Sequence, residues 1–429
     1  MHYLIVGNGV AGITAALTIR ARDRHAEITV AGGESDYFFS RTGLMYAFVD
    51  RMNPRDLEPY ERKSYEAKRI RLMKGWATRL DVERRVVSFD HGRDISYDRL
   101  LIAGGSEPNR GAWPGLDLIK DGVVHFVSLQ DLANCERLTP STRQAVVAGG
   151  GLIGVELVEC LVHHGVEVDF LIREPWYFPA ALSREEGVMV AENIRKHGVR
   201  LHLEQEIAAV SPDSVGRVAR ILTAKGLEFP CQMLGVCIGV RPAVDWLKHP
   251  EPALALGRGI KVGPDFQTSA PGVWAAGDCA EFTRADGSPL LEQIWYSAKR
   301  QGEFAANSMM GDEVAYQPPL YYNSAKFFEI EYTVVGDMRG DSVSSTFFYR
   351  VPGHNVSVRL TAKDGLLAGA SLLGSRWNHR LFETWIHRRR PVTEVVADLP
   401  MAQYDVEFGR AALSGLSAEF ERLHGKRAA

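Results

Sequence analysis

Gly7-Asn8-Gly9-Val10-Ala11-Gly12, close to the start of the chain, is the stretch that decides the expected fold. An apolar run at residues 2–6 precedes it, and residues 13–20 follow with the spacing of a helix. A second apolar run at residues 27–31 leads to Glu34, about 20 residues beyond Gly12. Strand, glycine loop, helix, strand and acid in this order predict a βαβ unit that binds a dinucleotide.

Each residue type in this loop has a physical reason. Gly7 makes the tight turn, Gly9 lets backbone N–H groups approach a pyrophosphate, and Gly12 lets the helix pack on the strand. The helix N-terminus then faces the phosphates, and Glu34 accepts hydrogen bonds from a ribose diol. A glycine-rich turn without a ligand is the alternative.

The same pattern occurs a second time. An apolar run at residues 144–148 leads into Gly149-Gly150-Gly151-Leu152-Ile153-Gly154, and a helix at 155–163 and a strand at 167–172 follow. Two such units in one chain suggest two nucleotides held face to face. That arrangement suits electron transfer between a nicotinamide and a flavin.

The bulk properties exclude several classes of function. A net charge of −3 and a pI near 6.5 give no support for a nucleic acid or a membrane surface as main partner. No apolar run is long enough to span a membrane, and the N-terminus already reads as a core strand rather than a signal peptide. The five scattered cysteines form no metal-binding set and fit a reducing compartment. We therefore expect a cytoplasmic protein without a metal site.

Further segments carry a resemblance to a known family. They are residues 97–108, where Ala103-Gly104-Gly105 stands in place of the typical Ala-Thr-Gly, residues 235–242, residues 268–278 and the helical segment 295–307. Together with the two glycine loops, they resemble the pyridine nucleotide–disulfide oxidoreductases, flavoproteins with two dinucleotide-binding domains. The resemblance implies FAD in the first unit and NAD(P)H in the second. It places FAD at Gly7, Gly9, Val10, Ala11, Gly12, Glu34, Arg41, Ala77, Ala103, Gly104, Gly277 and Asp278, and NAD(P)H at Gly149, Gly151, Ile153, Gly154, Arg173 and Gly239.

The order of the motifs predicts the domain organisation. The expected fold class is α/β, with two Rossmann-like domains, the second inserted in the first, and a C-terminal α+β domain. We place the FAD domain at residues 1–113 and 246–316, the NAD(P) domain at 114–245 and the C-terminal domain at 317–429. Turn signals at residues 113–115 and a proline-bearing stretch at residues 249–252 support the boundaries. In the family the C-terminal domain commonly builds a homodimer, but the apolar helix face expected near residues 377–386 fits an intrachain core equally well.

The segment that carries the redox cysteine in many relatives is altered here. Residues 38–46 resemble that segment, but Thr42 occupies the cysteine position. A threonine hydroxyl cannot form a mixed disulfide at neutral pH, so disulfide reduction is not expected. Phe39-Ser40-Arg41 also resembles a segment of ferredoxin and rubredoxin reductases, which implies that Arg41 pairs with the FAD pyrophosphate. A surface arginine at a helix start is the alternative.

Two side chains are candidates for the electron-transfer site. Glu156 matches a family glutamate near the nicotinamide carboxamide, and Trp295 is the candidate aromatic beside the flavin ring. An exposed helix acid and a core-packed tryptophan are the respective alternatives.

The choice of electron donor rests on the end of the second nucleotide-domain strand. Ile172 stands where NADH-using relatives carry an acid, and Arg173 follows. A nearby arginine favours a 2′-phosphate, which tilts the prediction mildly to NADPH. Glu174 can take the role of the missing acid, and loss of nucleotide binding is a further alternative.

The predicted function is an FAD-dependent NAD(P)H oxidoreductase that passes electrons directly to a non-disulfide acceptor. A ferredoxin- or rubredoxin-like carrier ranks first. A quinone, another small molecule or oxygen is the alternative acceptor, and a redox-sensing flavoprotein with little turnover is the alternative from another class.

Overall fold

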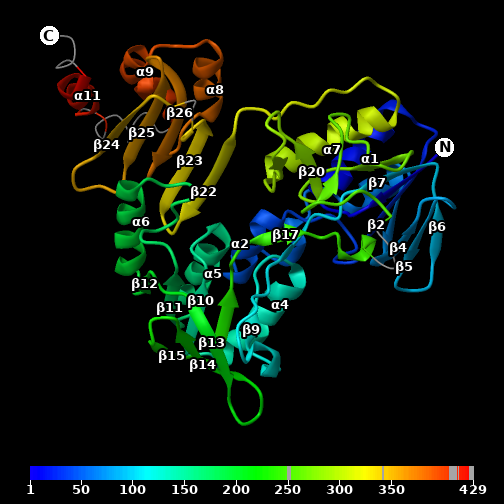
Figure 1. Cartoon of the computed structure of the whole chain (residues 1–429), viewed down its shortest axis with the longest axis horizontal. Coiled ribbons are helices and arrows are strands. Elements are labelled where there is room, and N and C mark those ends of the chain that lie inside the picture. Colours follow the sequence, from blue (N-terminus) through cyan, green and yellow to red (C-terminus); the bar gives the residue numbers. More distant parts are fainter. Residues whose placement is uncertain (249–252, 341–342, 405–412, 414, 425–429) are drawn as a thin grey trace.

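A computed structural model of the chain describes residues 1–248, 253–340, 343–404, 413 and 415–424. Figure 1 shows three lobes: one built from both the N-terminal segment and residues near 260–310, one from the segment between them, and one from the C-terminal part. The proline-bearing boundary stretch at 249–252 lies outside the described residues. The division at residues 113, 245 and 316 remains a prediction.

The first lobe is built on a parallel sheet with the strand order β19-β7-β1-β2-β3. Its central strand β1 is buried from Tyr3 to Val6, as expected for a parallel strand that is covered on both faces. A small antiparallel sheet, β4-β5-β6, and the pair β18-β20 with β21 complete the lobe. The bounds are β1 (His2–Val6), α1 (Val10–Arg22), β2 (Glu27–Gly32), α2 (Leu44–Phe48), α3 (Arg62–Ala67), β3 (Ile70–Lys74), β4 (Ala77–Asp81), β5 (Val86–Phe89), β6 (Asp94–Ser96), β7 (Arg99–Ile102), β18 (Ile260–Lys261), β19 (Val273–Ala275), β20 (Ala280–Thr283), β21 (Pro289–Leu290) and α7 (Trp295–Met309).

The second lobe repeats the design. Its parallel sheet has the order β12-β11-β10-β16-β9, and an antiparallel sheet, β13-β14-β15, lies beside it. A two-stranded antiparallel ribbon, β8 with β17, joins the first two lobes. The bounds are β8 (Ser106–Pro108), β9 (Val123–Val124), α4 (Leu129–Leu138), β10 (Gln144–Ala148), α5 (Leu152–His163), β11 (Glu167–Ile172), α6 (Arg184–Lys196), β12 (Arg200–Leu203), β13 (Ile207–Pro212), β14 (Val218–Thr223), β15 (Glu228–Pro230), β16 (Met233–Val236) and β17 (Val240–Pro242).

The C-terminal lobe is a five-stranded antiparallel sheet, β22-β23-β26-β25-β24, with helices packed against it. The helix predicted from Trp377 begins only at His379, because the backbone of Trp377 pairs with Gln403 instead. Phe382 and Trp385 on this helix are buried within the lobe's own core, so the apolar face has an intrachain partner. The bounds are β22 (Tyr322–Phe327), β23 (Ile330–Gly336), β24 (Ser345–Arg350), β25 (Ser357–Lys363), β26 (Leu366–Leu373), α8 (His379–His387), α9 (Val392–Asp398) and α11 (Leu416–His424).

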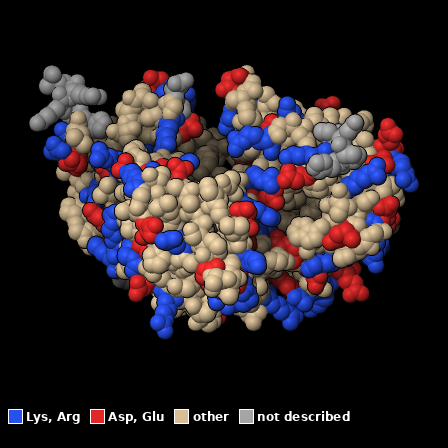
Figure 2. Space-filling model, turned by 60° about the horizontal axis from the view of Figure 1, so that its bottom comes forward, with Lys and Arg blue, Asp and Glu red and all other residues tan. Residues whose placement is uncertain are grey.

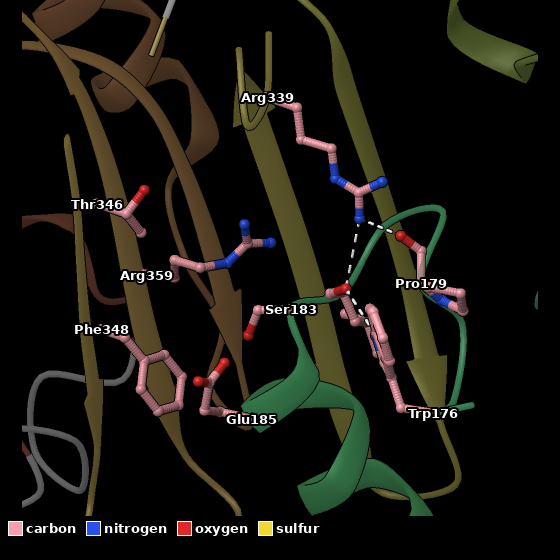
Figure 3. A pocket seen from close by; sticks show the side chains of 9 residues that line it. Trp176, Pro179, Ser183, Glu185, Arg339, Thr346, Phe348 and Arg359 are labelled. Atoms are coloured by element: carbon pink, nitrogen blue, oxygen red, sulfur yellow. Dashed lines mark hydrogen bonds between the residues drawn. The ribbon is translucent and has the colours of Figure 1, made fainter. Parts of the chain in front are cut away.

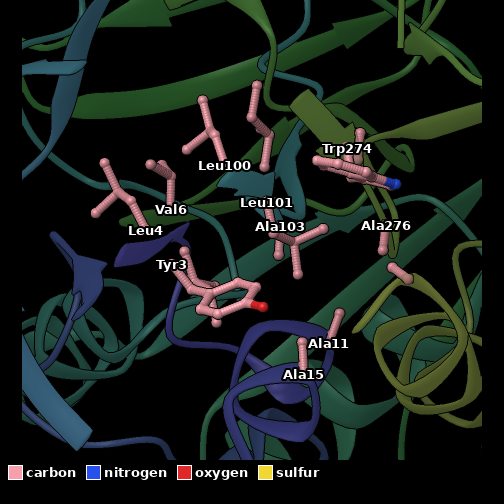
Figure 4. Close-up of a cluster of buried hydrophobic side chains, with 14 of the residues drawn as sticks. Tyr3, Leu4, Val6, Ala11, Ala15, Leu100, Leu101, Ala103, Trp274 and Ala276 are labelled. Atoms are coloured by element: carbon pink, nitrogen blue, oxygen red, sulfur yellow. The ribbon is translucent and has the colours of Figure 1, made fainter. Parts of the chain in front are cut away.

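The core of the first lobe brings together the glycine loop at residues 7–12 and the segment 268–278, both of which are predicted to hold FAD. Figure 4 shows side chains of β1 and β7 beside Ala11 and Ala15 of α1, with Trp274 and Ala276 close by. Small residues allow α1 and α7 to cross closely, since a Cβ at Gly302 would lie 2.2 Å from the Ala11 carbonyl oxygen. Segments almost 300 residues apart in sequence are thereby fixed against each other. The α/β fold class with two Rossmann-like units and a C-terminal sheet domain is confirmed.

Candidate functional site

The three glycines of the first loop differ in what surrounds them. A Cβ at Gly7 would lie 2.1 Å from the Ala103 carbonyl oxygen, and one at Gly12 would lie 1.9 Å from the Gly7 carbonyl oxygen. Both positions therefore exclude any side chain. A Cβ at Gly9 would have no atom within 4 Å. Packing within the chain does not explain this glycine, whereas close approach of a phosphate does.

The helices that follow the two glycine loops begin without side-chain caps. Gly9 and Gly151 are the N-caps of α1 and α5, and neither helix start receives a side-chain hydrogen bond. By contrast, Ser128 and Ser183 start α4 and α6 with complete capping boxes. The first N–H groups of α1 and α5 are thus left for an anion, which fits a pyrophosphate at each loop.

The segment 268–278, which is predicted to hold FAD through Gly277 and Asp278, lies directly against the first glycine loop. A Cβ at Gly277 would lie 3.1 Å from the Ala11 side chain. The neighbouring Asp278 accepts a 2.7 Å hydrogen bond from the hydroxyl of Ser106, which the sequence analysis did not assign to the site. Burial raises the pKa of Asp278, and the hydrogen bond from Ser106 and the charge of Arg41 oppose that rise.

A hydrogen-bond network holds this motif in place. The Gly277 N–H donates to Gln301 Oε1 at 2.8 Å, and Gln301 Nε2 donates to Glu292 at 3.0 Å. The Tyr316 hydroxyl donates to the same Glu292 oxygen at 2.9 Å. Gln301 is fully buried, so the network is a rigid support rather than a surface feature.

Two buried donors at the start of α7 have no acceptor among the described residues. They are Trp295 Nε1 and Gln293 Nε2. Buried N–H groups are rarely left unpaired in proteins. A bound ring system with carbonyl oxygens would satisfy them, which fits the predicted place of Trp295 beside the flavin.

Glu34 and Arg41, both predicted FAD ligands, lie side by side. Arg41 donates two hydrogen bonds to the Glu34 carboxylate, at 2.5 and 3.0 Å. Glu34 also accepts a 3.0 Å bond from the Leu129 N–H at the start of α4. The indole of Trp76 covers Gly33 so closely that a Cβ there would meet it at 2.1 Å. Ala77, also predicted for FAD, follows this tryptophan at the start of β4, whereas Trp76 itself was not predicted.

Three glycines of the second loop, residues 149–154, have the same surroundings as those of the first loop. A Cβ at Gly149 would lie 2.2 Å from the Cys237 carbonyl oxygen, one at Gly154 would lie 2.0 Å from the Gly149 carbonyl oxygen, and one at Gly151 would meet nothing within 4 Å. Ile153 lies in the first turn of α5, and Gly239 accepts a 3.0 Å hydrogen bond from the Asn109 N–H.

The end of β11 explains the departure from the family pattern. Ile172 is fully buried, and a Cβ at Gly150 would lie 3.0 Å from its side chain. This position thus belongs to the core under the loop. Arg173, which is exposed, donates a 2.8 Å hydrogen bond to Glu174. Arginine and acid are therefore paired at the edge where a nucleotide ribose is expected.

Glu156 lies in the second turn of α5 and is partly buried. Burial and the neighbouring Glu159 raise the pKa of Glu156 to about 7, while Lys326 lowers it. Lys326 extends from β22 of the C-terminal lobe and forms an ion pair with Glu159. Sequence analysis missed Lys326 and Glu159, and no local pattern could have paired residues 167 positions apart.

No thiol is available for redox chemistry near the predicted site. The Thr42 hydroxyl is exposed and lies 3.1 Å from that of Ser40. All five cysteines are buried and unpaired. Burial raises the pKa of each thiol, to about 12 for Cys231 and Cys237 and to about 11 for Cys279. None is therefore a thiolate at neutral pH.

A separate cavity of about 640 Å³ lies between the second and third lobes. Figure 3 shows Trp176, Arg339 and Arg359 on its walls. Arg339 donates to the backbone oxygens of Pro179 and Leu182, and Arg359 is tied to Glu186. These arginines are already engaged by the protein and join the second and third lobes.

The face shown in Figure 2 carries no large patch of side chains with the same charge. Acidic and basic side chains alternate there, and the surface is hollowed toward the middle. Among the described residues, no helix is both long and apolar enough to cross a membrane, and no three His, Cys, Asp or Glu side chains gather as metal ligands.

Comparison with known proteins agrees with this geometry. The model of the family described as pyridine nucleotide-disulphide oxidoreductase matches residues 1–309. The ferredoxin reductase component of chlorobenzene dioxygenase from Cupriavidus sp. (strain PS12) is 31% identical over 342 residues, 79% of this chain and 81% of the relative. The rubredoxin-NAD(+) reductase of Pseudomonas putida is 26% identical over 330 residues, 76% of this chain and 84% of the relative.

Solved structures show the same fold. The covalent complex of putidaredoxin reductase with putidaredoxin contains a chain with a TM-score of 0.80 and 20% identity, which covers 91% of this chain and 94% of that one. The NAD-dependent persulfide reductase of A. fulgidus has a TM-score of 0.83 and 22% identity, over 99% of this chain and 84% of that one.

Proposed function

The chain belongs to the pyridine nucleotide-disulphide oxidoreductase family, and on that premise we propose that it passes electrons from a reduced nicotinamide through FAD directly to a small ferredoxin- or rubredoxin-like protein. It is an NAD(P)H-dependent flavoprotein oxidoreductase. The observation that carries the proposed acceptor is Thr42, which stands where disulfide-reducing relatives keep a cysteine. Relatives named as ferredoxin and rubredoxin reductases support the same acceptor class.

The residues of the first lobe fit FAD in a defined way. The free N–H groups at the start of α1 would hold the pyrophosphate beside Gly9, and Glu34 and Asp278 would hold the ribose and ribityl hydroxyls. Trp295 and Gln293 would donate to the ring. When bound there, FAD would be able to accept a hydride and to release electrons one at a time.

The residues of the second lobe would present the nicotinamide nucleotide. Gly151 and the start of α5 would bind the pyrophosphate, and Glu156 lies on the same helix, where it would meet the carboxamide. This positioning is the protein's main contribution, because the hydride transfer itself belongs to the cofactors.

For the donor, we propose NADH rather than the NADPH that Arg173 alone suggests. Glu174 pairs with Arg173 and reduces the positive charge available to a 2′-phosphate, while its own carboxylate can accept from a ribose diol. Several relatives are named for NAD(+) or NADH, and a nitrite reductase is named for NAD(P)H. A homodimer and a cytoplasmic location, both expected from the sequence, remain part of the proposal.

The test follows the flavin absorbance near 450 nm in the purified protein under anaerobic conditions. Bleaching by NADH, followed by rapid reoxidation with a ferredoxin or rubredoxin, supports the proposal. If only a quinone or oxygen reoxidises the bleached flavin, the protein is a small-molecule reductase or an oxidase instead. Failure of both nucleotides to bleach the flavin would favour the redox-sensing alternative.

A further inference from the structure

One ammonium group lies where the three lobes meet. Lys326 of β22 forms its ion pair with Glu159 of α5, and the two side chains are only 23% and 20% exposed. The same ammonium lies 5.9 Å from the ring centroid of Tyr46 on α2. Tyr46 belongs to the segment that carries Thr42, so the C-terminal lobe reaches into the region of the predicted electron-transfer site.

Helix α5 presents two carboxyl groups to this one cation. Glu156 and Glu159 are three positions apart and therefore lie on the same side of the helix. Among the described residues, Lys326 is the cation paired with Glu159, and Glu156 has no ion-pair partner. Two partly buried carboxylates beside a single ammonium are most stable when one of them holds a proton.

The other titratable groups around Glu156 stay neutral near pH 7. They are Cys160 on the same helix, Tyr177 in the loop before α6 and Cys237 after β16. Burial raises the pKa of all three. The charges that act on the pKa of Glu156 are therefore those of Glu159, which raises it, and Lys326, which lowers it.

We propose that Lys326 is a positioning residue for the nicotinamide step, which pairs with Glu159 and leaves Glu156 as a hydrogen-bond donor to the carboxamide oxygen of the nucleotide. The inference rests on the proposed function. It assigns a part in the chemistry to the C-terminal lobe, through a side chain that touches neither cofactor.

The test compares the pH dependence of flavin reduction by NADH in the wild-type holoenzyme and four variants. Reduction of the wild type should slow as the pH rises through about 7, where Glu156 loses its proton. Lys326→Met should move the midpoint up by about one pH unit, because a nearby positive charge is lost. Glu159→Gln should move it down by a similar amount, because a negative charge is lost and Lys326 is freed for Glu156. Lys326→Arg should keep the wild-type midpoint, and Glu156→Gln should abolish the transition.

A second measurement does not depend on turnover. Infrared difference spectra of the oxidised holoenzyme between pH 6 and pH 8.5 should contain the C=O band of a protonated carboxyl, absent in Glu156→Gln. Its midpoint should shift in opposite directions in Lys326→Met and Glu159→Gln. Lys363→Met, which removes an exposed lysine from the same sheet, serves as the control and should shift nothing.

The outcomes separate the two ideas. Suppose that the carboxyl band titrates as expected but NADH does not reduce the flavin. The proposed function would then be wrong, whereas the inferred arrangement of charges around Glu156 would stand. Normal reduction with equal or parallel shifts in the two charge variants would overturn the inference. If Lys326→Met fails to retain FAD, Glu159→Gln and Lys326→Arg still decide it.

Discussion

At the scale of the residue, Gly9 and Gly12 are both glycine, but different physical requirements exclude a side chain at the two positions. The difference can be measured. We expect Gly12→Ala to destabilise the fold by about 1–3 kcal/mol or more, because its Cβ would overlap the Gly7 carbonyl oxygen. Gly9→Ala meets only open space and should change the stability of FAD-free protein by less than about 1 kcal/mol. It should nevertheless weaken FAD binding at least about tenfold. Thermal melts and the flavin content of both variants test this, and a normal flavin content in Gly9→Ala would contradict it.

Glu156 also has a consequence for stability that is independent of catalysis. Its pKa is about 7 in the folded protein against 4.5 for an ordinary glutamate, so the folded state binds the proton more tightly. The free energy of unfolding therefore falls as the pH rises from about 4.5 to about 7, by about 3 kcal/mol. Glu156→Gln cannot ionise and should be more stable than the wild type at pH 8 but not at pH 4.5. Melting temperatures at the two pH values check the sign, and an equal effect at both would refute it.

The pairing of Arg173 with Glu174 makes a prediction about the electron donor. Removing the acid by Glu174→Ala frees Arg173 for a 2′-phosphate, so kcat/KM for NADPH relative to NADH should rise about tenfold, or about 1.4 kcal/mol. Arg173→Ala should lower the same ratio. Steady-state kinetics with both nucleotides measure it; a ratio that does not change in either variant would place specificity elsewhere.

At the scale of the element, two ion pairs join α6 to the C-terminal sheet and differ mainly in burial. Arg359 and Glu186 are 6% and 0% exposed, whereas Arg350 and Glu192 are 38% and 47% exposed. Arg359→Met leaves a buried carboxylate without its partner and should cost about 3–5 kcal/mol. Arg350→Met should cost less than about 1 kcal/mol. Chemical denaturation compares them, with Arg359→Met/Glu186→Leu expected to recover part of the loss.

Elements whose pattern is local were predicted well from the sequence. Both glycine loops, with their flanking strands and helices, lie where the spacing placed them, because turn, strand and helix are encoded within about 30 residues. The start of α8 was placed too early, since a long-range bridge from Trp377 to Gln403 decides it. The partners of the site were missed for the same reason. Ser106 and Asp278 are 172 positions apart, and no local sequence pattern in either segment predicts their hydrogen bond.

At the scale of the whole molecule, the lobes are held together by contacts that only the assembled chain creates. The ribbon of β8 and β17 joins the first two lobes. Ion pairs from α5 and α6 of the second lobe hold the third lobe in place. The family resemblance predicted the lobes and their order, while the charges at their junctions depend on residues with no shared motif. Glu156 lies on α5 next to one of these junctions, the ion pair of Glu159 with Lys326, and this is where we propose the nicotinamide to bind.

The distribution of cysteines over the whole molecule gives the last prediction. The five thiols lie in the cores of the first two lobes, all are buried, and burial raises the pKa of each. A thiol reagent needs both access and a thiolate, so the folded protein should react with a disulfide reagent at least about 100-fold more slowly than a free thiol. Unfolding in guanidinium should release five reactive thiols per chain. Reduction of the flavin by NADH and its reoxidation by a carrier should be unaffected by prior treatment with an alkylating agent. If alkylation blocked electron transfer while FAD stayed bound, a cysteine would lie on the electron path, and direct transfer from the flavin would have to be abandoned.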